Sequence, residues 1–221
     1  MTLNIFQKYA PDDLSEFSIR EIKYARARYG LLNTLFAELQ KKPVSEIKIR
    51  DLCRIAEVSE PSFYNYFPQK DDLFFYFVQL WSIDSYLYSS GLTSGLEALV
   101  KFYSYTGKIA EAHPYLMKEL LSYQARADIQ SRAEIVPPVT TAEKVLVFGR
   151  VAEIEKIPGE GLRNLIFMKL KKAVENKELP KNTQLPDAAM AVGGIFFGVA
   201  ELCASSNFEN LSNHYMNSLK I

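Results

Sequence analysis

Cysteine and histidine are scarce in this chain of 221 residues, which contains two of each. Cys53 and Cys203 lie far apart, and neither has a companion at metal-ligand spacing, which argues against a disulfide framework and a zinc site. His113 and His214 belong to no Cys/His, Ser/His/Asp or HExxH pattern. We therefore expect no metal, no cofactor, no catalytic residues and a reducing compartment.

Signals for export or membrane insertion are also missing. The first thirteen residues have Lys8 as their only positive charge and lack the apolar core of a signal peptide. The longest apolar run, Ala188 to Ala204, is too short for a comfortable membrane span and contains Glu201. We expect a cytoplasmic protein with no membrane partner, in which this run is buried between proteins.

The formal net charge is zero, but the charges are unevenly distributed. Residues 18–70 contain ten Lys and Arg against six Asp and Glu, and the rest of the chain contains sixteen against twenty. Lys and Arg bind duplex DNA by displacing condensed counterions. This asymmetry is weak by itself and gains weight from the motif that it surrounds.

Two short helical patterns meet at a tight corner between Ile49 and Phe74. The first has one apolar face, formed by Ile49, Leu52, Ile55 and Ala56. The second begins at Ser59, whose hydroxyl can cap a helix, and Pro61 is tolerated in the first turn. Phe63 and Phe67 anchor this second helix. The pattern predicts a helix-turn-helix.

Polar groups suited to phosphates and base edges line the outer side of the second helix. The residues on this side are Glu60, Pro61, Ser62, Tyr64, Asn65 and Tyr66, and all except Pro61 carry a polar group. The stretch resembles the DNA-binding head of the tetracycline-repressor (TetR) family, with matching residues at Leu52, Cys53, Ala56, Val58, Ser59, Ser62, Phe63, Tyr64, Tyr66, Phe67, Lys70 and Leu73. The resemblance implies a recognition helix from Ser59 to Tyr66 in the major groove, with Ser62, Tyr64 and Tyr66 on phosphates and Lys70 as a phosphate clamp.

Two positions depart from the family pattern. Glu57 stands where the family has Gly, at a corner that is expected to be left-handed, and this costs about 1 to 2 kcal/mol. Lys48 replaces the usual Thr or Ser cap of the first helix. The motif remains, and we include Ser59 and Lys48 among the candidate DNA-binding residues.

A long helix is predicted from Ile19 to Leu39, with a stripe of Leu31, Leu32, Leu35, Phe36 and Leu39. On the other side Arg28 is either a phosphate contact or part of a solvated face. We predict an all-α protein with an extension over residues 1–18, docked through Ile5, Phe6 and Tyr9, a three-helix helix-turn-helix DNA-binding domain over 19–70, and a larger helical effector-binding and dimerisation domain over 71–221.

The predicted larger domain contains several further helices. The spacing of apolar residues and breakers places them from Asp71, from Leu96 to His113, from Tyr115 to Ala133, from Thr140 to Glu155, from Leu162 to Lys177, from Asp187 to Ala204 and from Leu211 to Leu219.

The resemblance implies that the helices starting at Leu162 and Asp187 form a four-helix bundle with a second copy, which makes the protein a homodimer. Interface candidates are Leu170, Val192, Gly193, Phe196, Phe197 and Ala200. The alternative is a core helix within one chain.

The larger domain is also rich in rings that could line a site for an apolar or aromatic effector. These are Phe102, Tyr103, Tyr105, Tyr115, Tyr123, Phe148 and Phe167, each of which could instead be an ordinary core residue. We expect a non-enzymatic transcriptional regulator, a repressor that binds an inverted repeat in double-stranded DNA. A helical scaffold protein that retains the motif, and then a helical enzyme, are the alternatives.

Overall fold

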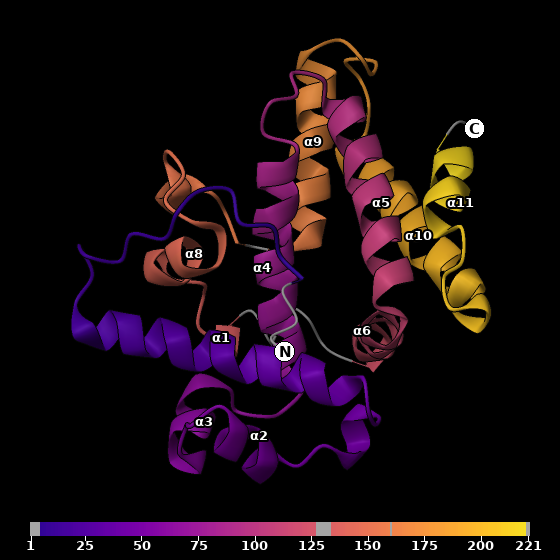
Figure 1. Cartoon of the computed structure of the whole chain (residues 1–221). Helices are drawn as coiled ribbons and strands as arrows, with labels where there is room; N and C mark the ends of the chain where they lie inside the picture. The colour runs from indigo at the N-terminus through magenta and orange to yellow at the C-terminus, as the bar shows by residue number, and fades with distance from the viewer. Residues whose placement is uncertain (1–4, 127–133, 160, 220–221) are drawn as a thin grey trace. The chain divides into compact units, whose positions relative to one another are not determined.

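The computed structural model describes residues 5–126, 134–159 and 161–219, and all regular structure in this part of the chain is helical (Figure 1). The predicted all-α fold is confirmed. The elements are α1 (Ile19–Leu39), η1 (Val44–Glu46), α2 (Ile49–Ile55), α3 (Glu60–Tyr66), α4 (Asp72–Tyr88), α5 (Gly95–Ala112), α6 (Pro114–Arg126), α8 (Thr141–Phe148), η2 (Ile154–Lys156), α9 (Leu162–Glu175), α10 (Leu185–Cys203), η3 (Ala204–Ser206) and α11 (Leu211–Ser218). Residues 127–133, in which we predicted the end of the helix that begins near Tyr115, lie outside the described ranges.

The chain forms two compact units. Unit 1 consists of Met1–Asp84 and Ser122–Gly159, and unit 2 consists of Ser85–Leu121 and Glu160–Ile221. The predicted functional boundary at residue 70 stays a prediction, because a division by packing does not say which residues bind DNA or an effector.

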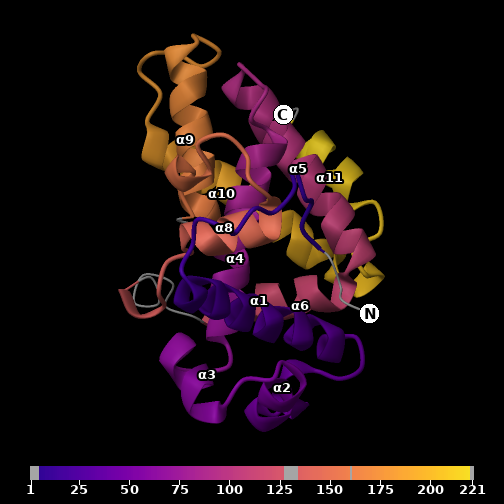
Figure 2. The ribbon, with the colours of Figure 1, turned by 60° about the vertical axis from the view of Figure 1, so that its left-hand side comes forward.

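Helix α1 forms because its N-terminus is capped and one side is apolar. The Ser18 hydroxyl accepts a hydrogen bond from the Glu21 amide, and the Glu21 carboxylate accepts one from the Ser18 amide at 2.8 Å. The predicted stripe is buried, with Leu31, Leu32 and Leu35 fully inaccessible. Both ribbon views show α1 lying along α2 and α3 (Figures 1 and 2).

Helix α2 buries a different face from the one that we predicted. Leu52 and Cys53 are buried, whereas Ile55 is 48% exposed at the last position of this two-turn helix. Cys53 and Ile55 lie about 200° apart around the helix, so Ile55 points away from the buried Cys53. The expectation that Ile55 is buried was wrong, and Cys53 is buried in its place.

The N-terminal segment packs on α8 and the inner side of α4 in unit 1. Phe6 is 3% exposed and lies 5.5 Å from the Phe77 ring and 5.7 Å from the Phe148 ring. The Tyr9 amide donates to the Phe148 carbonyl at 2.8 Å, and the Tyr9 hydroxyl donates to the Asp84 carboxylate at 2.8 Å. The extension is therefore part of the core of unit 1.

Contact with this segment also explains why the helix predicted from Thr140 to Glu155 was too long. Thr140 and Glu143 form a capping box at its start, but α8 ends at Phe148. Gly149 has φ of +89°, and a Cβ atom there would lie 1.8 Å from the Ala10 carbonyl oxygen. The chain turns at this glycine to meet the N-terminal segment.

Unit 2 is built around α5, which contacts both α9 and α11, while α10 contacts α9 and α11 (Figures 1 and 2). At Gly95 a Cβ atom would lie 2.3 Å from the Lys169 carbonyl oxygen, so the absence of a side chain lets α5 approach α9 closely. Tyr103 is completely buried and its ring packs against Phe196 and Tyr215. This aromatic cluster is the core of unit 2.

Candidate functional site

The corner between α2 and α3 is closed by a left-handed residue. The Val58 amide donates to the Cys53 carbonyl at 2.9 Å, and Glu57 has φ of +55°. This six-to-one hydrogen bond with a left-handed residue before it is a Schellman ending. The expected left-handed corner is therefore present although the residue is Glu.

Helix α3 starts at a serine cap and is fixed by two buried rings. The Ser59 hydroxyl accepts a hydrogen bond from the Ser62 amide at 3.2 Å and lies 2.8 Å from the Ser62 hydroxyl. Phe63 and Phe67 are completely buried and hold the inner side of the helix. The opposite side is thereby held outward.

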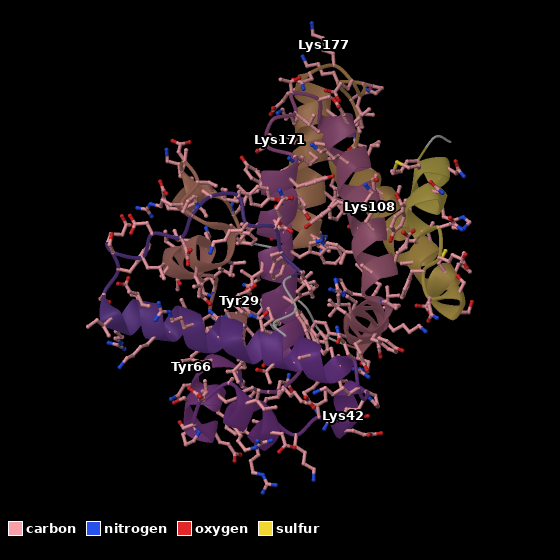
Figure 3. The ribbon with its side chains drawn as sticks, in the orientation of Figure 1. Tyr29, Lys42, Tyr66, Lys108, Lys171 and Lys177 are labelled. Atoms are coloured by element: carbon pink, nitrogen blue, oxygen red, sulfur yellow. The ribbon has the colours of Figure 1, made fainter. Side chains whose placement is uncertain are left out.

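The outer side of α3 carries four exposed candidates, which are Glu60, Pro61, Tyr64 and Asn65. Tyr64 is 51% exposed. Tyr66, at the end of α3, is partly covered because its ring packs edge-on against Tyr24 of α1 at 5.2 Å (Figure 3). The helix thus offers hydroxyls, an amide and a carboxylate on one surface.

The two candidate lysines differ in their surroundings. Lys48 is exposed and precedes α2, where it makes no side-chain capping bond. The Lys70 ammonium donates to the carbonyls of Val44 and Ile47 at 2.5 and 2.6 Å. Lys70 therefore ties the start of α4 to the turn before α2, a structural role that the sequence did not indicate.

Arg28 must be removed from the candidate DNA-binding residues, because it is completely buried. One guanidinium nitrogen lies 3.2 Å from each carboxylate oxygen of Glu143, and the carbonyls of Pro137 and Pro138 accept hydrogen bonds at 3.0 and 3.3 Å. The guanidinium also lies over the Tyr76 ring, 4.2 Å from its centroid. No surface remains for a phosphate.

Residues 31–77 match the family described as "Bacterial regulatory proteins, tetR family". This segment belongs to the TetR family. It runs from the second part of α1 through η1, α2 and α3 into α4, and so contains the whole corner and the exposed side of α3.

The fold of the chain is similar to that of a solved TetR regulator. The chain resembles the crystal structure of a TetR transcriptional regulator from Rhodococcus sp. RHA1, with a TM-score of 0.55 over 87% of this chain and 96% of that chain. The sequence identity is 16%, so this likeness shows a shared fold. No curated protein matches the chain. The TetR-family segment and this fold support a transcriptional regulator.

The candidate effector-binding rings are not all in one place. Tyr123 and Phe148 belong to unit 1, and the other five belong to unit 2. In unit 2 the Tyr103 hydroxyl donates to the Val192 carbonyl at 2.6 Å, and Tyr105 stacks on Tyr88 at 4.4 Å. Several candidates thus have packing roles within the chain.

Exposure also separates the candidate rings. Phe102, Tyr103, Tyr123 and Phe148 are buried, whereas Tyr115 is 60% and Phe167 is 36% exposed. All seven candidates are aromatic residues, and the sequence patterns assigned no role to Lys169 of α9. Lys169 could have been noticed because it is a lysine within the apolar stripe of that helix.

The dimer candidates fall on two sides of the apolar helix α10 and its neighbour α9. Leu170, Phe196 and Ala200 are at most 3% exposed within one chain, so they can add little further buried surface to a dimer. Val192 and Gly193 are partly exposed, and Phe197 is 40% exposed. The buried residues therefore belong to the core of the chain, and the interface stays a prediction for the exposed ones.

The outward side of α10 is unusually apolar. Met190 and Leu202 are 76% and 82% exposed, and a Cβ at Gly193, Gly194 or Gly198 would meet no atom within 4 Å. The segment Leu185–Ser206 is long and apolar enough to cross a membrane by length and composition, and little of it is buried within the chain. Core helices of soluble proteins can have the same length and composition.

Proposed function

We propose that this TetR-family protein is a homodimeric, cytoplasmic transcriptional repressor. Two copies bind an inverted repeat in duplex DNA, and a small apolar or aromatic effector releases them. The observation that carries the proposal is the helix-turn-helix of residues 49–66, whose corner is closed and whose α3 keeps its polar side exposed. A helix of this kind enters the major groove, and a two-fold dimer reads two half-sites.

The proposed contacts divide by their chemistry. Ser59, Ser62, Tyr64, Tyr66 and Lys48 supply hydroxyls and charge to phosphates, which positions the protein without reading sequence. The carboxylate of Glu60 can accept from a cytosine amino group, and the Asn65 amide can pair with adenine. Pro61 packs beside them. We propose two roles for Lys70. It holds the turn at 44–47 through hydrogen bonds to two backbone carbonyls, and it contacts a phosphate.

The proposed dimer uses the outward side of α10. Three exposed side chains, Met190, Phe197 and Leu202, lie on a helix whose glycines are open to a close neighbour. A second copy would cover this side and remove an apolar surface of a kind that monomeric proteins rarely expose. This is also our reason for assigning the helix to a protein interface without a membrane partner.

The proposed effector acts through a difference in affinity between two conformations. If it prefers the conformation in which the two DNA-binding segments are badly spaced, a coupling of about 1 to 3 kcal/mol lowers DNA affinity roughly 5- to 150-fold. DNA must then lower effector affinity by the same factor. Regulation by binding requires no catalytic group, and we propose no enzymatic activity.

Selection of random duplexes by the purified protein, followed by titration of the selected site at several salt concentrations, tests the DNA-binding proposal. Lys48→Ala should weaken all duplexes similarly and reduce the salt slope by about one unit. Asn65→Ala should leave the slope unchanged and relax the preference at one base pair, at a cost of about 1 to 3 kcal/mol. Lys108→Ala, an exposed lysine of α5 (Figure 3), is the control and should change neither. Failure to enrich any inverted repeat would contradict the proposal.

A further inference from the structure

Lys169 is a buried lysine on the inner side of α9. Its side chain is 9% exposed, between the buried residues Ile166 and Leu170 of the same helix. The ammonium lies 5.0 Å from the centroid of the Tyr86 ring. Among the described residues, no carboxylate lies within 4.0 Å of this ammonium, so its charge is not neutralised by an ion pair.

The other two lysines at this end of α9 behave differently. Lys171 is exposed and lies 4.0 Å from the Glu175 carboxylate, and Lys172 donates to the Leu92 carbonyl at 3.0 Å. Desolvation, together with the positive charge of Lys172, lowers the pKa of Lys169 to about 8. Of these three lysines of α9, Lys169 is the one that is buried and whose positive charge lacks an anionic partner.

Such an arrangement is unfavourable for the protein without ligand. An anion and hydrogen bonds stabilise a desolvated ammonium more than one aromatic face does. Ser85, which precedes Tyr86 in α4, is 1% exposed. Its hydroxyl has no hydrogen-bond partner among the described residues. Two buried polar groups from α4 and α9 in unit 2 thus lack full partners.

We propose that Lys169 binds the carboxylate of the effector, and that the effector is consequently an organic acid with an apolar or aromatic body. The Tyr86 ring beside the ammonium provides an apolar wall for that body. A single ammonium with one additional positive charge nearby suits a monoanion better than a phosphate, which usually binds to several donors at once. This proposal rests on the proposed function, because it names the chemical class of the effector.

The first test needs no ligand. Lys169→Met retains most of the side-chain length and removes the charge, so the thermal midpoint of the free protein should rise. Lys171→Met is the matched control on the same helix and should leave the midpoint nearly unchanged. A lower midpoint for Lys169→Met would show that the ammonium has stabilising partners in the free protein, and would overturn the proposal.

The second test uses acids paired with their amides, namely benzoate and benzamide, phenylacetate and phenylacetamide, indole-3-acetate and indole-3-acetamide, and decanoate and decanamide. Thermal shift and calorimetry should find at least one acid that binds the wild-type protein about tenfold or more tightly than its amide. Lys169→Met should lose about tenfold or more in affinity for that acid and change amide binding less than twofold. A panel in which no acid exceeds its amide, or an acid that binds Lys169→Met equally well, would refute the assignment.

Operator affinity measured with and without the acid separates this proposal from the proposed function. An acid that binds through Lys169 and leaves operator affinity unchanged would support the assignment of Lys169 and contradict induction. An acid that releases the operator from wild-type and Lys169→Met protein alike would support induction and contradict the assignment.

Discussion

Replacement of Arg28 by Met should destabilise unit 1 strongly. The substitution leaves the completely buried carboxylate of Glu143 without its cation and removes the donors to the carbonyls of Pro137 and Pro138. Breaking a buried pair by removing one partner costs about 3 to 5 kcal/mol. A domain is typically stable by about 5 to 15 kcal/mol, so this cost is a large part of the total.

The assay can follow unit 1 alone, because the single tryptophan, Trp81, lies in unit 1 and is 2% exposed. For a urea dependence of about 2 kcal/mol per M, the midpoint of Trp81 fluorescence should fall by about 1.5 to 2.5 M. Arg126→Met is the matched control, since Arg126 is 58% exposed and lies 3.7 Å from Asp71. Loss of that exposed pair should cost roughly 0 to 1 kcal/mol.

A double-mutant cycle decides whether the pair with Glu143 is responsible. Arg28→Met combined with Glu143→Met removes both charges, so the double variant should be more stable than the sum of the two single losses predicts. A loss below about 1 kcal/mol for Arg28→Met, or additive losses in the cycle, would refute the reasoning. Where the variant is folded, its salt slope for DNA should equal that of the wild type, because Arg28 contacts no phosphate.

Three further predictions concern other regions. Glu57→Gly should stabilise the protein by about 1 kcal/mol in urea unfolding, since φ is +55° there; destabilisation would mean that the Glu side chain contributes more than the strain. Hydrogen bonds from the amides of Leu96 and Gly95 and from Asn176 and Ser94 lower the pKa of Glu178 from its ordinary 4.5 to about 2. Wild-type stability should therefore fall as the pH drops from about 4.5 towards 2. This part of the loss should be absent in Glu178→Gln. Phe197→Glu should give monomers with weak operator binding, as measured by light scattering and titration, while dimers with unchanged binding would place the interface elsewhere.

Local patterns predicted the helices and the turn of residues 19–66 well because these features are determined by neighbours in sequence. The apolar stripe of residues 19–39, the serine cap at Ser59 and the turn near Glu57 all depend on contacts a few residues apart, and all three are present in the structure. The regular spacing of Leu31, Leu32 and Leu35 was sufficient to place the long helix.

Contacts between distant residues account for the errors. Arg28 resembles a surface residue by its position in α1, and its burial depends on Glu143, Pro137 and Pro138, which are 109 to 115 residues away. The end of α8 at Gly149 depends on residue 10, and no pattern within residues 140–155 reveals that contact. Likewise, the family resemblance suggested Phe196 for the dimer, but its packing against Phe102 and Tyr215 within the chain depends on two other helices.

The docking of the N-terminal segment on residues 148–150 has a consequence for synthesis on the ribosome. The Tyr9 amide pairs with the carbonyl of Phe148, and the Arg150 amide pairs with that of Pro11, so these backbone hydrogen bonds cannot form until residue 150 has emerged. At about 5 to 20 residues per second, this delay is roughly 7 to 30 s. During this time α1 to α3 can form, but Phe6 and Phe77 still lack the Phe148 side of their cluster. Unit 1 therefore completes its folding only after more than half of the protein has been made, and premature termination before residue 148 would leave aromatic surface open to aggregation.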